Sequence, residues 1–202
     1  MKKRLIIIIL LLTFKNYAQN NPKEAFQKNR YELAVSHYKK GEFTKALDLF
    51  SVANKINPEN DFGKESMKKI DTLKTILRKD FITKIVGTWY FTGDKPSWAV
   101  NQADNQPVIR SMQITENKIE FYEQDKKTKI KKLIKAEDLV FYDKNKSDAL
   151  FSAIRLSNGN IWQCSVTEDS KTLHAINIAE ENENGVKKID SDNKERFYTK
   201  AL

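Results

Sequence analysis

The chain has few of the residues from which catalytic and metal sites are usually built. Its 202 residues include one cysteine, two histidines and six scattered glycines. A single cysteine excludes both an intramolecular disulfide and a CxxC motif. The glycines form no phosphate-binding loop, and neither a GxSxG nor an HExxH sequence is present. We therefore predict a protein that is not an enzyme and needs no metal or cofactor, although a hydrolase built on two carboxylates would leave no spacing signature.

The cysteine and the histidines also lack a sequence context for chemistry. Cys164 alternates with Trp162 and Val166 in an expected strand, a pattern typical of a small buried hydrophobe. His37 falls in an expected helix and His174 in an alternating strand, far apart in the sequence. Two histidines do not make a zinc site unless carboxylate ligands complete the coordination. We assign neither of them a ligand role.

Long apolar runs are scarce as well, and the main one lies at the beginning of the chain. Leu5–Phe14, interrupted by Thr13, follows the basic residues 2–4 and precedes Ala18. This layout predicts a signal peptide at residues 1–18 and an exported protein, periplasmic or secreted. An uncleaved anchor is the alternative, but ten residues fall short of the ~20 that span a bilayer. We expect no stable membrane span after cleavage.

Removal of residues 1–18 would also lower the net charge. The full chain carries +9, and four of its 36 basic residues lie in that segment, so residues 19–202 carry 32 basic and 27 acidic residues. A net charge of +5 gives little support for a nucleic-acid partner, and we predict none. The densest basic run spans residues 126–132. We interpret it as a solvated hairpin, with an anion-binding surface as the alternative.

The remaining chain has two regions whose apolar residues recur with different periods. Up to about residue 80 the spacing is three and four, which predicts helices over Pro22–Lys40 and Thr44–Ile56 and a third from about Asp61. After residue 80 the chain contains all three tryptophans and short runs in which apolar and polar residues alternate. The predicted class is α+β, with a helical region at 19–80 and a β domain at 84–202, joined by a short linker at Arg78–Lys84.

The stretch from residue 30 to 60 resembles a tetratricopeptide repeat. Five of its residues fall at the positions of that family's pattern, namely Leu33, Ala46, Phe50, Ala53 and Pro58. The family's Trp, Gly and Tyr positions hold Arg30, Ala34 and His37 instead. The resemblance implies a helical hairpin with a capping helix that binds another envelope protein or peptide. By analogy with the family, the partner would contact Gln27 or Lys28, Tyr31, Val35, Tyr38 and Lys39.

The second region predicts a closed antiparallel barrel or a β-sandwich. Turn signals such as Asn158-Gly159 and Asn184-Gly185 separate eight or nine short strands, with no helix between them. The first strand is expected within Ile85–Phe91. The others are expected near Val108–Thr115, Lys118–Gln124, Lys129–Lys135, Leu139–Asp143, Leu150–Leu156, Asn160–Thr167, Leu173–Ala179 and Arg196–Lys200.

The ends of this region resemble lipocalin-like barrels. Gly87-Thr88-Trp89 matches the G-x-W signature of the first strand, and Arg196 stands in the closing segment. The resemblance implies a β-barrel of about eight strands in which Arg196 stacks on the Trp89 ring. Such a barrel is either filled by side chains or holds one small ligand. Residues for an apolar ligand would be Phe91, Phe121 and Trp162 inside, with Trp98 in the loop above the mouth.

Two binding functions follow from these patterns. The first is an exported, non-enzymatic protein–protein interaction adaptor of the cell envelope that uses its helices. The alternative is a carrier or sensor of a small apolar ligand in the C-terminal barrel.

Overall fold

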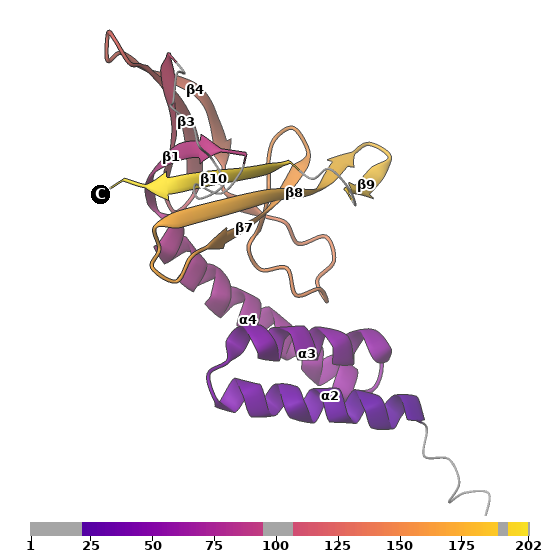
Figure 1. Ribbon diagram of the computed structural model, residues 1–202. Coiled ribbons are helices and arrows are strands. Elements are labelled where there is room, and N and C mark those ends of the chain that lie inside the picture. Colours follow the sequence, from indigo (N-terminus) through magenta and orange to yellow (C-terminus); the bar gives the residue numbers. More distant parts are fainter. Residues whose placement is uncertain (1–21, 95–106, 190–193, 202) are drawn as a thin grey trace, which may run out of the picture. The chain divides into compact units, whose positions relative to one another are not determined.

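The computed structural model describes residues 22–94, 107–189 and 194–201. Over these residues, three helices precede a large antiparallel sheet, as the α+β prediction requires (Figure 1). The chain divides into two compact units. One holds the described residues up to Lys74 together with Asn145–Ala149, and the other holds the described parts of Thr75–Lys144 and Leu150–Leu202. The predicted signal peptide and Trp98 lie outside the described residues.

The helical unit is built from α2 (Pro22–Lys39), α3 (Phe43–Ile56) and the first part of α4 (Asp61–Ile85). Small residues let α2 and α3 approach closely, because Ala34, Ala46 and Ala53 are all fully buried. Phe50 is also fully buried and packs edge-on against the Tyr31 ring, with 5.6 Å between ring centres. The predicted ranges of the first two helices therefore agree with the structure to within one residue at each end.

A fully buried glutamine holds the ends of these helices together. The Gln27 side-chain amide donates to the carbonyl oxygens of Ala53 and Asn57 at 2.9 and 2.8 Å. It also exchanges hydrogen bonds with the Asn60 side chain. These carbonyls lie at the end of α3, where no further helical amide is available to them. Gln27 is thus an internal cap, so of the two alternatives given for a partner contact, Gln27 or Lys28, the structure excludes Gln27.

A short loop from the β region of the sequence belongs to the helical unit. The Ser51 hydroxyl donates to the carbonyl oxygen of Ser147 at 2.6 Å. The ammonium of Lys74, a residue only 3% exposed, donates to the carbonyl of Lys146 and pairs with the Asp148 carboxylate at 3.3 Å. Such a buried charge requires a partner. No helical or strand periodicity marks these loop residues, so the sequence could not have revealed this contact.

The predicted linker does not exist as a separate segment. The helix α4 continues without a break through Arg78–Lys84 and ends at Ile85. Its apolar stripe is extended by Leu77, Phe81 and Ile85 at four-residue spacing, and all three side chains are buried. With neither glycine nor proline in this segment, nothing in the local sequence interrupts the helix.

The β domain is a single antiparallel sheet in which neighbouring strands follow the order β4-β3-β2-β1-β10-β8-β7-β6-β5, with β9 paired to β8. Side chains alternate between its two faces, as in β8, where every second residue is buried. β9 was not predicted from the sequence. The strands are β1 (Gly87–Gly93), β2 (Val108–Ile114), β3 (Lys118–Asp125), β4 (Lys131–Asp138), β5 (Val140–Phe141), β6 (Ala153–Arg155), β7 (Asn160–Val166), β8 (Thr172–Asn182), β9 (Gly185–Lys188) and β10 (Glu195–Lys200).

Backbone hydrogen bonds do not close this sheet into a barrel, because the described parts of its end strands β4 and β5 do not pair with each other. A side chain bridges the sheet instead. The Glu137 carboxylate in β4 accepts hydrogen bonds from the backbone N–H and the hydroxyl of Ser157, at 2.9 and 3.1 Å. Ser157 lies in the turn between β6 and β7, near the other end of the strand order. Glu137 also pairs with Lys135.

Trp89 joins the end of α4 to the sheet. Its side chain is fully buried, and its indole N–H donates to the carbonyl oxygen of Ile85 at 2.7 Å. The ammonium of Lys200 donates to the neighbouring Lys84 carbonyl at 2.9 Å and lies 5.2 Å from the centre of the Trp89 ring. A Cβ atom on Gly87 would come within 3.3 Å of the Lys200 side chain. These contacts satisfy carbonyls that a helix C-terminus leaves unpaired.

The predicted stacking of Arg196 on Trp89 was wrong. Register decides this, because Trp89 lies opposite Lys200 in the β1–β10 pair, whereas Arg196 lies four residues away and opposite Ala175 of β8. Lys200 therefore takes the position over Trp89. The guanidinium of Arg196 instead lies 4.9 Å from the centre of the Trp162 ring.

The joint at Trp89 can be tested by comparing two tryptophan-to-phenylalanine variants. Trp89→Phe leaves the Ile85 carbonyl without its donor, and we expect it to lower the free energy of unfolding by about 2 kcal/mol. Trp162→Phe is the matched control, because the N–H of Trp162 has no acceptor within the described residues. Urea denaturation gives both values. Equal destabilisation by the two substitutions would contradict the role assigned to the Trp89 hydrogen bond.

Candidate functional site

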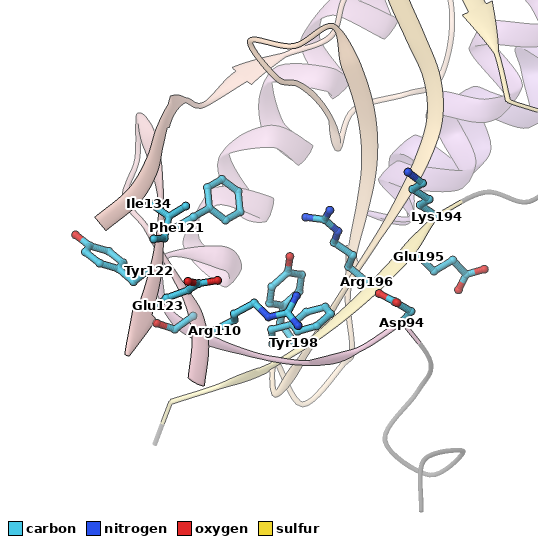
Figure 2. A pocket seen from close by; sticks show the side chains of 12 residues that line it. Asp94, Arg110, Phe121, Tyr122, Glu123, Ile134, Lys194, Glu195, Arg196 and Tyr198 are labelled. Carbon is cyan, nitrogen blue, oxygen red and sulfur yellow. The ribbon is translucent and has the colours of Figure 1, made fainter. Parts of the chain in front are cut away.

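The inner face of the sheet surrounds a hollow of about 650 Å³. Phe91 of β1, Phe121 of β3 and Tyr198 of β10 contribute its apolar surface, and Ile134 of β4 lies at its side (Figure 2). A volume of this size falls within the range of small-molecule sites. The hollow is therefore the part of the β domain best suited to take a ligand.

Two smaller recesses adjoin the hollow. An apolar recess of about 50 Å³ lies between Phe81 and Ile85 of α4 and inward residues of the sheet that include Phe121 and Trp162. A side recess of about 300 Å³ is lined by residues that include Glu137 and, again, Trp162. Phe121 and Arg196 line all three spaces. Because Phe121 and Trp162 come from strands far apart in the sheet order, the sheet must curl around this interior.

Polar side chains lie among the rings that line the hollow, and they include both cationic and acidic residues, namely Arg110, Lys194, Arg196, Asp94, Glu123 and Glu195. In Figure 2 Arg110, Arg196 and Tyr198 point into it, whereas Glu195 and Tyr122 point away. The guanidinium carbon of Arg110 lies 4.9 Å from the centre of the Phe91 ring, and the Phe91 and Tyr198 rings meet edge to face. Burial raises the pKa of Tyr198, although Arg196, by its charge and a hydrogen bond, and the charge of Arg110 oppose this. Tyr198 is therefore a neutral phenol at physiological pH.

Three carboxylates line the hollow, those of Asp94, Glu123 and Glu195, but none of them forms an ion pair with Arg110 or Arg196 among the described residues. Glu123 is opposite Arg110 in the β2–β3 register, but no ion pair joins their side chains. Glu195 pairs with His174, with 2.9 Å between Oε2 and Nε2. The two guanidinium groups thus retain donors that an anionic group could use.

Trp162 supplies a further unused donor. The residue is 6% exposed, and its indole nitrogen is buried with no hydrogen-bond partner among the described residues. Buried tryptophan N–H groups usually have an acceptor, and an orphaned one carries a free-energy cost. Trp162 itself lines both recesses.

The described residues contain no arrangement suited to metal chemistry. They include no group of three His, Cys, Asp or Glu side chains that could hold an ion. Cys164 lines the apolar recess, is 8% exposed, and has its pKa raised to about 12 by burial. The prediction that Cys164 is a small buried side chain is confirmed. No described helix is both long enough and apolar enough to cross a membrane.

The structure brings together most of the residues proposed for an apolar ligand. Phe91 and Phe121 line the hollow and Trp162 lines the recesses, while Trp98 lies outside the described residues. Sequence reasoning missed Arg110, Tyr198 and the inward position of Arg196. For Arg110 a signal was present in the sequence. It alternates with Met112 and Ile114, so it takes a position on the face that otherwise carries apolar, inward side chains.

The residues proposed to bind a protein share a stripe of α2, but the two tyrosines already have partners. Tyr31 packs between Phe50 and Phe62, and Tyr38 contacts Phe43 and lies beneath the Lys69 ammonium. The remaining three behave differently from one another: Lys28 pairs with Glu32 at 3.8 Å, Val35 is half-buried and Lys39 is exposed. At the same time Phe26 and Leu33 of α2 are substantially exposed.

Comparison with known proteins does not assign the chain to a family. It matches no protein-family model, no curated protein and no solved structure at a significant level. The function must therefore be argued from the geometry of the hollow and its recesses.

Burial of Cys164 predicts that its thiol does not react while the protein is folded. With a pKa of about 12, roughly one thiol in ten thousand is ionised at pH 8. We expect negligible modification by a chromogenic disulfide reagent at pH 8 in buffer, and one equivalent in denaturant. Stoichiometric labelling of the native protein within minutes would contradict the buried position of Cys164.

The Glu137 bridge predicts a stability change at acid pH. Burial raises the pKa of Glu137, but Lys135 and the two donors of Ser157 outweigh this and hold it below its ordinary value near 4.5. The stabilisation is therefore present above pH 4.5 and is lost as the pH falls through the lowered value. Glu137→Gln should lower the free energy of unfolding by about 1–3 kcal/mol at neutral pH and by less at about pH 3.

Urea denaturation at the two pH values measures this effect, and Glu116→Gln in the exposed β2–β3 turn is the matched control. A difference between Glu137→Gln and the unmodified protein that stays constant with pH would exclude the ionised bridge.

Proposed function

We propose that the β domain binds a small amphipathic molecule on the inner face of its sheet. The observation that carries the proposal is the 650 Å³ hollow, which shares Phe121, Arg196 and Tyr198 with an adjoining apolar recess. Apolar spaces with a few convergent polar groups are typical of ligand sites. The protein would act as a carrier or sensor and not as a catalyst.

The distribution of polarity within the site suggests how the ligand lies. Its apolar part lies along Phe91, Phe121 and Ile134 in the hollow, where burial removes hydrocarbon from water, and only its tip reaches the apolar recess of about 50 Å³. Its polar end lies beside Arg110 and Arg196, whose guanidinium groups have no ion pair among the described residues. Charge-assisted hydrogen bonds to a carboxylate are stronger than those to a neutral group, so an anionic end is favoured.

The finer fold assignments belong to this proposal. A lipocalin-like barrel would combine the curled sheet with the Glu137–Ser157 bridge, and it would place the ligand inside the curl. The tetratricopeptide-like identity of the helical unit and its role as an adaptor stay predictions. So does export: a protein that carries an amphipathic molecule outside the cytoplasm is consistent with the N-terminal sequence.

Titration calorimetry with decanoate and decanol tests the site, because the two ligands share a chain length and differ in charge. We expect both to bind, decanoate more tightly. Arg196→Gln should weaken decanoate binding by about tenfold, the loss expected for a charge-assisted hydrogen bond, and should change decanol binding little. The control is Lys187→Gln, in β9 and exposed. If neither ligand binds, the proposed function is wrong; if both bind equally, the anionic end is wrong.

A further inference from the structure

Positive charge is concentrated at the tip of the β3–β4 hairpin. The twelve residues from Gln124 to Lys135 contain six lysines and one aspartate. Residues 19–202 hold 32 basic and 27 acidic residues, so 26 of each remain once this tip is set aside. The tip thus accounts for the whole positive excess of the chain beyond residue 18. A concentration of like charge favours association with an anionic surface.

The carboxylate at the tip is used within the turn. Asp125 accepts hydrogen bonds from the backbone N–H groups of Lys127 and Thr128, at 2.8 and 2.7 Å, and from the Thr128 hydroxyl. These bonds lower the pKa of Asp125, which therefore stays ionised and fixes the turn. Around it, Lys127 and Lys132 are exposed and form no ion pair within the described residues.

Large aliphatic side chains stand exposed among these lysines. Ile130 is 69% exposed, Leu133 48% and Ile134 51%. Leu133 lies opposite Tyr122, whose ring points away from the hollow, whereas Ile134 lines the hollow (Figure 2). Apolar side chains are therefore presented on both faces of the hairpin. Figure 1 shows its tip reaching beyond the other strands of the sheet.

We propose that this tip docks on an anionic lipid surface. Lysines beside exposed aliphatic residues suit the boundary between headgroups and acyl chains, where the ammonium groups meet lipid phosphates and the aliphatic groups enter the apolar layer. A projecting hairpin with exposed aliphatic side chains on both faces suits a partner that surrounds it, as a bilayer interface does. This surface is separate from the residues proposed to hold the amphipathic ligand, apart from Ile134.

Two other occupants fit the observations less well. A second copy pairing along the β4 edge would bring Lys131, Lys132 and Lys135 against the same residues, and like charges opposite each other destabilise a sheet. An acidic peptide added as a strand would cover the β4 edge but would leave Ile130, which precedes the strand, uncovered. Lysines on an edge strand also discourage such pairing.

Vesicle co-sedimentation tests the proposal on the chain that begins at Gln19, which keeps every described residue. We expect binding to phosphatidylcholine vesicles with about 30% phosphatidylglycerol and none to phosphatidylcholine alone, with loss at high salt. Each lysine near an anionic surface contributes about fivefold to affinity. Lys127→Gln with Lys132→Gln should therefore weaken binding by about 25-fold. The same change at Lys187 and Lys188, exposed in β9, is the matched control.

A second set of variants distinguishes insertion of aliphatic side chains into the bilayer from electrostatic attraction to its surface. Ile130→Ser with Leu133→Ser should weaken vesicle binding, whereas Val140→Ser, at a residue 49% exposed in β5, should not. Absence of binding to the anionic vesicles would overturn the proposal, as would equal losses in the control variants. Binding of a soluble glutamate-rich peptide that depends on Lys127 and Lys132, without vesicle binding, would assign the tip to a peptide instead.

Discussion

The arrangement of the β domain depends on the buried indole of Trp89. Its ring fills the space where α4 ends and β1 begins, and its N–H satisfies a carbonyl of the last helical turn. The ammonium of Lys200 in β10 donates to the preceding carbonyl, that of Lys84, and lies over the Trp89 ring. The first strand β1, the last strand β10 and the end of α4 are thus held together at one point. Because Phe81 and Ile85 of the same helix pack into the sheet interior, this joint also closes the apolar end of the cavity.

From this joint the interior of the sheet changes character along its strands. Near the helix it is lined by Met112, Ile114 and Leu173, all buried and apolar. Toward the other end Arg110 enters the same inward positions, whereas Arg196 lines both the hollow and the apolar recess. The gradient runs along β2, where Arg110, Met112 and Ile114 share one face because alternation keeps every second side chain there. An elongated molecule with one apolar and one charged end fits such a gradient better than a wholly apolar one.

The sequence located most of the elements, and its errors have identifiable causes. The helices were marked by the spacing of Ala46, Phe50 and Ala53, and the strands by alternation. The end of α4 was missed because Phe81 and Ile82 could begin a strand as readily as continue a helix. β9 was missed because Gly185–Lys188 is short and mostly polar, and its pairing with β8 provides its place in the sheet. Of the candidate site, the aromatic residues were found and the arginines were not.

By itself, the sequence determined that helices precede strands, how the apolar residues of each segment are spaced, and that Cys164 is buried. These features follow from local spacing. Strand register and sheet curvature depend on pairings between distant residues, which no local pattern specifies. The tertiary structure alone therefore decided that Lys200 covers Trp89, that Arg196 lies over Trp162, and that Glu137 reaches Ser157. It likewise decided that Gln27 is an internal cap, because the carbonyls it binds come from another helix.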